Sequence, residues 1–160
     1  MIQIFYSKSC EKYVHGAGKA LEDTYCLRNY RNGVLEAISP AYNAERNQYD
    51  AASLLEYMTR MKEADIALWI VDKDIYVKDR SFVYGYAAKH YGAVLSACRL
   101  KSEDLVIKEA LHETGHIIGL VHCENRCFMR FSNCLDDVRT KPSRLCEPCR
   151  EACSRLIKAR

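Results

Sequence analysis

The chain has 160 residues, of which 49% are hydrophobic, and its formal net charge is +3. This length suits one compact domain, and the apolar fraction excludes an intrinsically disordered chain. Basic and acidic residues are mostly interleaved, so the small positive excess gives no reason to expect nucleic acid or an anionic membrane as a partner.

The longest apolar run, at 66–71, is far shorter than the roughly 20 residues that span a membrane. The N-terminus lacks the basic and then apolar pattern of a secretory signal. The nine cysteines are an odd number, which argues against an extracellular disulfide scaffold. We therefore expect a cytoplasmic protein with reduced thiols, some of them holding metal, and no membrane association.

Hydrophobic periodicity predicts five strands, at 2–6, 34–38, 66–71, 82–87 and 93–98. Two helices are predicted between the first three strands, at 10–26 and 45–63. The second helix has an apolar stripe made of Leu54, Leu55, Met58 and Met61. This order predicts an α/β fold in which an at least partly parallel sheet carries helices.

A third helix is predicted from Ser102, whose hydroxyl can cap it, to Gly119, where a positive φ is often needed. Its core-facing side is expected to contain Ile107, Leu111, Thr114 and Ile118. Its other side is expected to contain Glu109, His112, Glu113 and His116. That second side is too polar to be buried without a metal or a wet cleft, because unpaired buried polar groups cost a few kcal/mol each. A last helix is expected at 147–159.

The segment His112–His122 has the spacing of a catalytic zinc site. His112 and His116 lie one helical turn apart on the same face, and a turn after Gly119 can return His122 as a third ligand. Three protein ligands leave the fourth zinc position open, as catalytic sites require. Exposed helix histidines are the alternative, but three of the five histidines fall within these eleven residues.

Glu113 is the candidate general base in this segment. A zinc-bound water has a pKa of about 7, so a neighbouring carboxylate can take its proton as the oxygen attacks a peptide carbonyl. The carboxylate then delivers the proton to the departing amine. The sequence therefore predicts zinc-dependent hydrolysis of peptide bonds.

Four later cysteines are candidates for a second, structural zinc site: Cys123, Cys127, Cys146 and Cys149. Four thiolates give the closed tetrahedral coordination of structural zinc, and Cys-x-x-Cys is a common chelating pair. Cys134 and Cys153 are rival ligands, since one falls between the pairs and the other lies one helical turn after Cys149. Disulfides and redox catalysis are weaker alternatives.

Residues 112–149 closely resemble the archaemetzincins, a metallopeptidase family whose zinc motif runs directly into a cysteine cluster with Cys-x-Met and Cys-x-x-Cys. One difference is the loop between Cys123 and Cys127, which has three residues, one fewer than is typical of the family. The resemblance implies a metzincin-like mixed twisted sheet with helices, an active-site helix and a small Cys-rich C-terminal lobe. It implies a single metallopeptidase domain at 1–160, with an N-terminal part at 1–119 and a zinc lobe at 120–160.

The resemblance also suggests roles for residues near the zinc motif. Met129 resembles the methionine that metzincins place in a tight turn beneath the zinc ligands. Some metzincins have a tyrosine where this chain has Phe131, which cannot ligate. In metzincins the strand nearest the zinc pairs with an extended substrate, and residues 82–87, with Tyr84 and Tyr86, are the candidate here.

The other cysteines and histidines are expected to be structural. Cys10, Cys26 and Cys98 are most simply small buried hydrophobic residues, and His15 and His90 are expected on the surface.

The expected partner is a peptide or unfolded protein, with no nucleic acid. The main alternative is a non-catalytic zinc module that binds a protein or nucleic acid through its cysteine lobe. That lobe has the basic residues Arg126, Arg130, Arg139, Lys141, Arg144, Arg150 and Arg155. A third reading, a hydrolase of non-peptide amides or esters, uses the same zinc site.

Overall fold

A mixed five-stranded sheet forms the centre of the molecule in the computed structural model, which describes residues 1–159. In spatial order the strands are β2 (Asn29–Val34), β1 (Ile2–Tyr6), β5 (Ile66–Val71), β8 (Gly92–Ser96) and β7 (Gly85–Ala88). The first four are parallel, and β7 runs antiparallel to β8 at the edge. The expectation of a mixed α/β sheet is confirmed.

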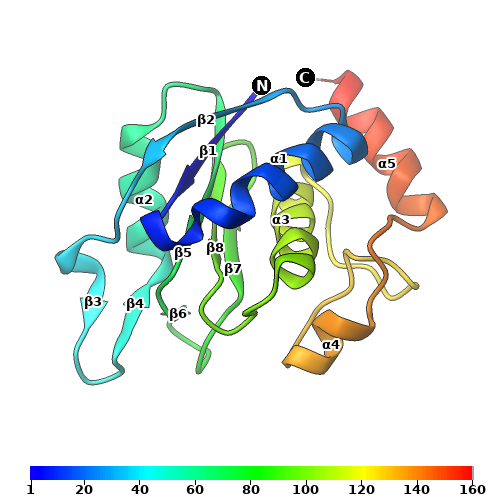
Figure 1. Cartoon of the computed structure of the whole chain (residues 1–160). Helices are drawn as coiled ribbons and strands as arrows, with labels where there is room; N and C mark the ends of the chain where they lie inside the picture. The colour runs from blue at the N-terminus through cyan, green and yellow to red at the C-terminus, as the bar shows by residue number, and fades with distance from the viewer. Residues whose placement is uncertain (160) are drawn as a thin grey trace.

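Both faces of this sheet are buried, as parallel sheets require. In β5 the side chains of Ile66, Leu68 and Ile70 join one apolar cluster, and those of Ala67, Trp69 and Val71 join another. Helices α1 (Glu11–Tyr25) and α3 (Glu103–Ile118) cover the first face, and α2 (Ala51–Met61) covers the second (Figure 1). Helix α3 is therefore held directly against the sheet.

The predicted strand at 34–38 is wrong, because the strand that pairs with β1 is β2 at Asn29–Val34. This edge strand is mostly polar, so it carries little apolar periodicity. Leu35 is nevertheless buried in the core, and its carbonyl accepts a hydrogen bond from Trp69 Nε1 at 2.9 Å. The apolar residues after β2 thus pack on the sheet without forming a strand.

The predicted helix at 45–63 starts later than expected, because Asp50 caps α2 by accepting a hydrogen bond from the Ser53 amide at 3.0 Å. The residues before it form the short hairpin strands β3 (Tyr42–Asn43) and β4 (Gln48–Asp50). With β6 (Ile75–Tyr76) they make a second, three-stranded sheet. Met61 ends the helix and is 48% exposed, whereas the rest of the predicted stripe is buried.

The C-terminal segment packs on the α3 side of the sheet. It contains α4 (Leu135–Thr140), which was not predicted, and α5 (Glu147–Lys158). Phe128, Met129 and Val138 are fully buried in the same cluster as α1 and α3. Two 3-10 turns, η1 (Lys8–Cys10) and η2 (Ser39–Ala41), complete the fold. Within the described residues, no helix is both long and apolar enough to cross a membrane.

Candidate active site and metal centres

Helix α3 begins and ends as its sequence predicts. The Ser102 hydroxyl accepts a hydrogen bond from the Leu105 amide, at 3.4 Å, and Gly119 has a left-handed φ of 119°. The amides of Gly119 and Leu120 both donate to the Gly115 carbonyl, at 3.0 and 2.9 Å. This turn reverses the chain, so the next residues pass back beside the last turn of the helix.

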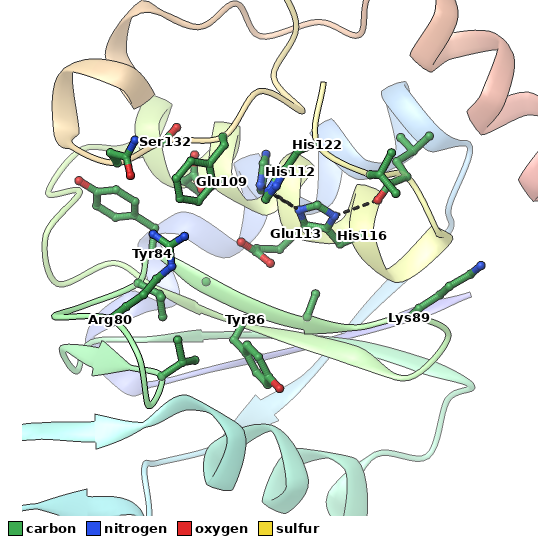
Figure 2. Close-up of a pocket in the computed structure, with 18 of the residues that line it drawn as sticks. Arg80, Tyr84, Tyr86, Lys89, Glu109, His112, Glu113, His116, His122 and Ser132 are labelled. Carbon is green, nitrogen blue, oxygen red and sulfur yellow. Dashed lines mark hydrogen bonds between the residues drawn. The ribbon is translucent and has the colours of Figure 1, made fainter. Parts of the chain in front are cut away.

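The reversal brings three imidazole rings together. His116 Nε2 lies 3.0 Å from His112 Nε2 and 3.2 Å from His122 Nε2 (Figure 2). Nitrogen ligands at 2.0–2.1 Å around one tetrahedral zinc are about 3.3 Å apart, so this donor set fits that ion. The structure thus gathers the three histidines that the sequence singled out as one group of metal donors.

Backbone carbonyls orient two of these rings. His112 Nδ1 lies 2.8 Å from the Phe128 carbonyl, and His116 Nδ1 lies 2.9 Å from the Leu120 carbonyl. Because a carbonyl only accepts, each Nδ1 carries the proton and donates it. Each Nε2 is then left with a free lone pair directed at its neighbours, which is the tautomer that metal-binding histidines use.

The environment keeps these imidazoles neutral. Burial lowers the pKa of His112 well below its usual value, and the charge of Lys141 adds to this effect. Burial also lowers the pKa of His116 and of His122. Neutral imidazole is the form that can bind a cation, so the site is ready for metal near neutral pH.

The carboxylate of Glu113 lies beside the three rings and against the backbone of β7. Its side chain is buried, and burial followed by the nearby Glu109 raises its pKa well above the usual value. An ideal Cβ placed on Gly85 would lie 2.4 Å from Glu113 Oε1. Only a glycine therefore leaves room for the carboxylate at this point of the strand.

These groups line a cleft of about 540 Å³ between α3 and the edge of the large sheet (Figure 2). Residues from β7 and the segment before it form one wall. Phe131, Ser132 and Asn133 also line the cleft. The Phe131 ring lies 5.1 Å from that of His122 and offers no ligand atom.

Glu109, which lines this cleft, belongs to a buried ion pair that has no signature in the sequence. Lys141 Nζ is 2.5 Å from Glu109 Oε1, and the two side chains are 2% and 3% exposed. Lys141, one of the basic residues of the C-terminal lobe, is thus buried and not part of that lobe's surface. Lys108 adds a second link, since its Nζ donates to the carbonyls of Val138, Arg139 and Lys141 at 2.7–3.1 Å.

Four cysteine sulfurs form a second group of potential metal donors. The Sγ atoms of Cys123, Cys127, Cys146 and Cys149 all lie within 4.8 Å of one another. Two pairs of residues far apart in sequence thus meet, and Cys123 Sγ is 3.6 Å from Cys146 Sγ. Zinc–sulfur bonds of about 2.3 Å place thiolates about 3.8 Å apart, so this set fits a tetrahedral ion. The rivals Cys134 and Cys153 lie outside the group.

Backbone amides donate hydrogen bonds to two of these sulfurs. The amides of Met129 and Cys146 each lie 3.4 Å from Cys127 Sγ, and the Asn125 amide lies 3.3 Å from Cys123 Sγ. Burial favours the neutral thiol of Cys146, but hydrogen bonds from the Cys149 amide and the Asn125 side chain outweigh it and lower its pKa to about 7. Amides directed at sulfur are typical surroundings of metal-binding thiolates.

The remaining predicted positions are partly as expected. Met129 is fully buried beneath α3, where a Cβ on Gly115 would lie 2.4 Å from its sulfur. His15 and His90 are exposed. Among the cysteines expected in the core, Cys10 is buried and Cys98 is half-buried. Cys26 is exposed; it follows the end of α1 in a left-handed conformation, with φ of 54°.

Comparisons with known proteins agree with this geometry. The model of peptidase family M54 matches residues 30–155. The archaemetzincin of Nanoarchaeum equitans is 44% identical over 109 residues, which are 68% of this chain and 64%, just under two thirds, of that relative. The archaemetzincin of Archaeoglobus fulgidus is also 44% identical, over 115 residues covering 68% of this chain and 70% of that protein.

Solved structures extend the similarity to nearly the whole chain. A crystal structure of the Archaeoglobus fulgidus archaemetzincin, complexed with malonate, has a TM-score of 0.86 and 34% identity, and covers 94% of this chain and 98% of that one. The archaemetzincin of Methanopyrus kandleri has a TM-score of 0.90 and 29% identity over 99% of this chain and 96% of its own. The chain therefore belongs to peptidase family M54, the archaemetzincins, and is a metallopeptidase.

Proposed function

We propose that His112, His116 and His122 hold one catalytic zinc ion and that Glu113 is the general base for hydrolysis of peptide bonds. The observation that carries this proposal is the approach of His116 Nε2 to 3.0 and 3.2 Å from the Nε2 atoms of His112 and His122, beside a buried carboxylate in an open cleft. When bound there, zinc supplies a Lewis acid that polarises the scissile carbonyl and acidifies water.

Glu113 performs the proton transfers. Its carboxylate takes a proton from the attacking water, so the oxygen becomes a stronger nucleophile. It then gives this proton to the amide nitrogen that leaves as an amine. Gly85 keeps the carboxylate at a fixed place, because the strand approaches it without a side chain between them. His112 and His116 stay oriented through the carbonyls of Phe128 and Leu120.

The substrate we propose is an extended peptide or a segment of unfolded protein that lies along β7. This strand is at the edge of the sheet, so the backbone groups on its outer side have no partner strand among residues 1–159. Edge strands bind extended peptides through backbone hydrogen bonds, and pockets for alternate side chains add specificity.

We further propose that Cys123, Cys127, Cys146 and Cys149 hold a second, structural zinc ion in a single domain at 1–160. In this arrangement the zinc lobe at 120–160 is fixed to the N-terminal part at 1–119. Residues 127–129 connect the two centres. Cys127 belongs to the cysteine group, and the carbonyl of the next residue, Phe128, accepts the hydrogen bond from His112 Nδ1. A site of four thiolates supports a reducing compartment such as the cytosol.

Metal analysis combined with digestion of a peptide library tests these assignments. We expect two zinc ions per chain and hydrolysis that falls by about 10²–10⁴ in Glu113→Gln with the zinc content unchanged. Glu22→Gln, an exposed change on α1, is the matched control and should behave as the wild type. Full activity in Glu113→Gln removes the general-base assignment. Two bound zinc ions without hydrolysis of any peptide favour the non-catalytic zinc module instead.

A further inference from the structure

The charged groups that reach the cleft are not balanced. Glu109 is paired with Lys141, and the carboxylate of Glu113 is buried against Gly85. Two cations also line the cleft, Arg80 before β7 and Lys89 after it, and Figure 2 shows them on opposite sides of the histidines. Neither makes an ion pair within residues 1–159. A ligand in the cleft therefore meets positive charge that the protein itself does not neutralise.

Arg80 is the better placed of these two cations to recognise a specific group. Its guanidinium carbon lies 4.6 Å from the centre of the Phe131 ring, and that ring lies 5.1 Å from the ring of His122. Stacking uses the flat face of the guanidinium and leaves the N–H donors at its edge available. Phe131 thus orients the arginine beside the reaction centre while its hydrogen-bonding edge stays exposed.

The backbone of Arg80 is also held in place. Arg46 Nη2 donates to the carbonyls of Arg80 and Ser81 at 2.6 and 3.2 Å, and Gln48 Nε2 donates to that of Ser81 at 2.8 Å. The loop before β7 is therefore fixed from the small sheet. A side chain that starts from a fixed backbone and rests on an aromatic ring loses less entropy when it binds a ligand.

We propose that Arg80 binds a carboxylate of the peptide substrate, so that the enzyme prefers substrates with a negative charge near the cleaved bond; this rests on the proposed peptidase function. A carboxylate matches the guanidinium fork with two parallel hydrogen bonds. Arg80 and His122 both contact the Phe131 ring, at 4.6 and 5.1 Å from its centre. The guanidinium therefore lies no farther from the His122 ring than the length of about three residues of extended peptide, at roughly 3.3 Å per residue. The carboxylate comes either from an aspartate or glutamate side chain or from the C-terminus.

The test compares fluorogenic peptides that differ in a single carboxylate. One set carries glutamate or glutamine at each of the three positions on either side of the cleaved bond, with the C-terminus amidated. The other set is neutral and ends in either a free carboxylate or an amide. We measure kcat/KM for the wild type, Arg80→Gln and Lys78→Gln. Lys78 is the matched control, because it is an exposed cation of the same loop that does not line the cleft.

We expect at least one carboxylate peptide to be cleaved about tenfold more efficiently than its neutral counterpart, which corresponds to about 1.4 kcal/mol. Arg80→Gln should bring that ratio close to one, and Lys78→Gln should preserve it. The set that shows the preference identifies the source of the carboxylate. Equal cleavage of charged and neutral peptides by the wild type, or an unchanged ratio in Arg80→Gln, overturns the inference.

Binding distinguishes this inference from the peptidase function itself. In zinc-loaded Glu113→Gln, anisotropy of labelled peptides reports affinity without turnover. We expect the carboxylate peptide to bind about tenfold more tightly than the neutral one, and the added change Arg80→Gln to remove that difference. If both proteins bind the carboxylate and the neutral peptide with equal affinity, the role of Arg80 is refuted even if no peptide is ever cleaved. If the affinities differ as expected but the wild type cleaves no peptide, only the peptidase proposal is refuted.

Discussion

Replacement of Lys141 by methionine should destabilise the fold strongly, although the residue is not itself a candidate metal ligand. Methionine keeps most of the volume but leaves the carboxylate of Glu109 buried without its cation. The two side chains are only 2% and 3% exposed, so water cannot replace the lost partner. Removal of one member of a buried pair costs about 3–5 kcal/mol. Burial already raises the pKa of Glu109, so proton uptake by this carboxylate limits the penalty near the lower value.

Urea unfolding followed by circular dichroism measures this cost, with zinc-loaded proteins of equal metal content. With a penalty near the lower value, about 3 kcal/mol, and a slope of about 2 kcal/mol/M, we expect the midpoint of Lys141→Met to fall by roughly 1.5 M. The double variant Glu109→Gln with Lys141→Met should recover most of the loss, because it leaves no buried charge. Lys19→Met is the matched control, since Lys19 pairs with Asp23 at 2.9 Å on the surface, and its midpoint should not change. A midpoint for Lys141→Met equal to that of this control refutes the reasoning.

Three further predictions concern the base, the cysteine group and pH. Gly85→Ala should lower kcat/KM about 100-fold at unchanged zinc content, because a Cβ 2.4 Å from Glu113 must displace the carboxylate; wild-type activity contradicts this. Cys149→Ser should reduce the metal analysis from two zinc ions to one and lower the melting temperature, while exposed Cys134→Ser leaves both unchanged; two retained ions exclude the four-thiolate site. Burial raises the pKa of Cys10 from 9.0 to about 11. The neutral thiol therefore contributes fully to the free energy of unfolding below pH 9, and this contribution is lost as the pH rises from 9 to 11. Urea unfolding at pH 7.5, 9 and 10 should therefore show the wild type losing stability relative to Cys10→Ala only above pH 9, and parallel pH profiles argue against this.

Local spacing predicts much of the site. The cap at Ser102, the turn at Gly119 and the one-turn separation of His112 and His116 are consequences of helix geometry over a few residues. The structure places these groups where that geometry requires. The meeting of the two cysteine pairs was expected from donor chemistry, because a Cys-x-x-Cys pair supplies half of a tetrahedral site.

Long-range contacts were not predictable in the same way. Glu109 and Lys141 are 32 positions apart, and nothing around Lys141 distinguishes it from a surface lysine. Arg80 was not singled out either, because its importance depends on Phe131, which belongs to another part of the fold. Strand β2 and the β3–β4 hairpin escaped prediction because an edge strand and two- or three-residue strands carry too little apolar periodicity.

The single tryptophan of the chain has a practical consequence for experiments. Trp69 is fully buried on the α2 face of the sheet and donates to the Leu35 carbonyl. The two groups of metal donors are on the opposite, α3 face. The fluorescence of Trp69 should therefore change when the sheet itself unfolds. It should not change while a chelator removes metal from the C-terminal lobe. Dyes that respond to released metal and the indole signal should follow different time courses in one and the same sample.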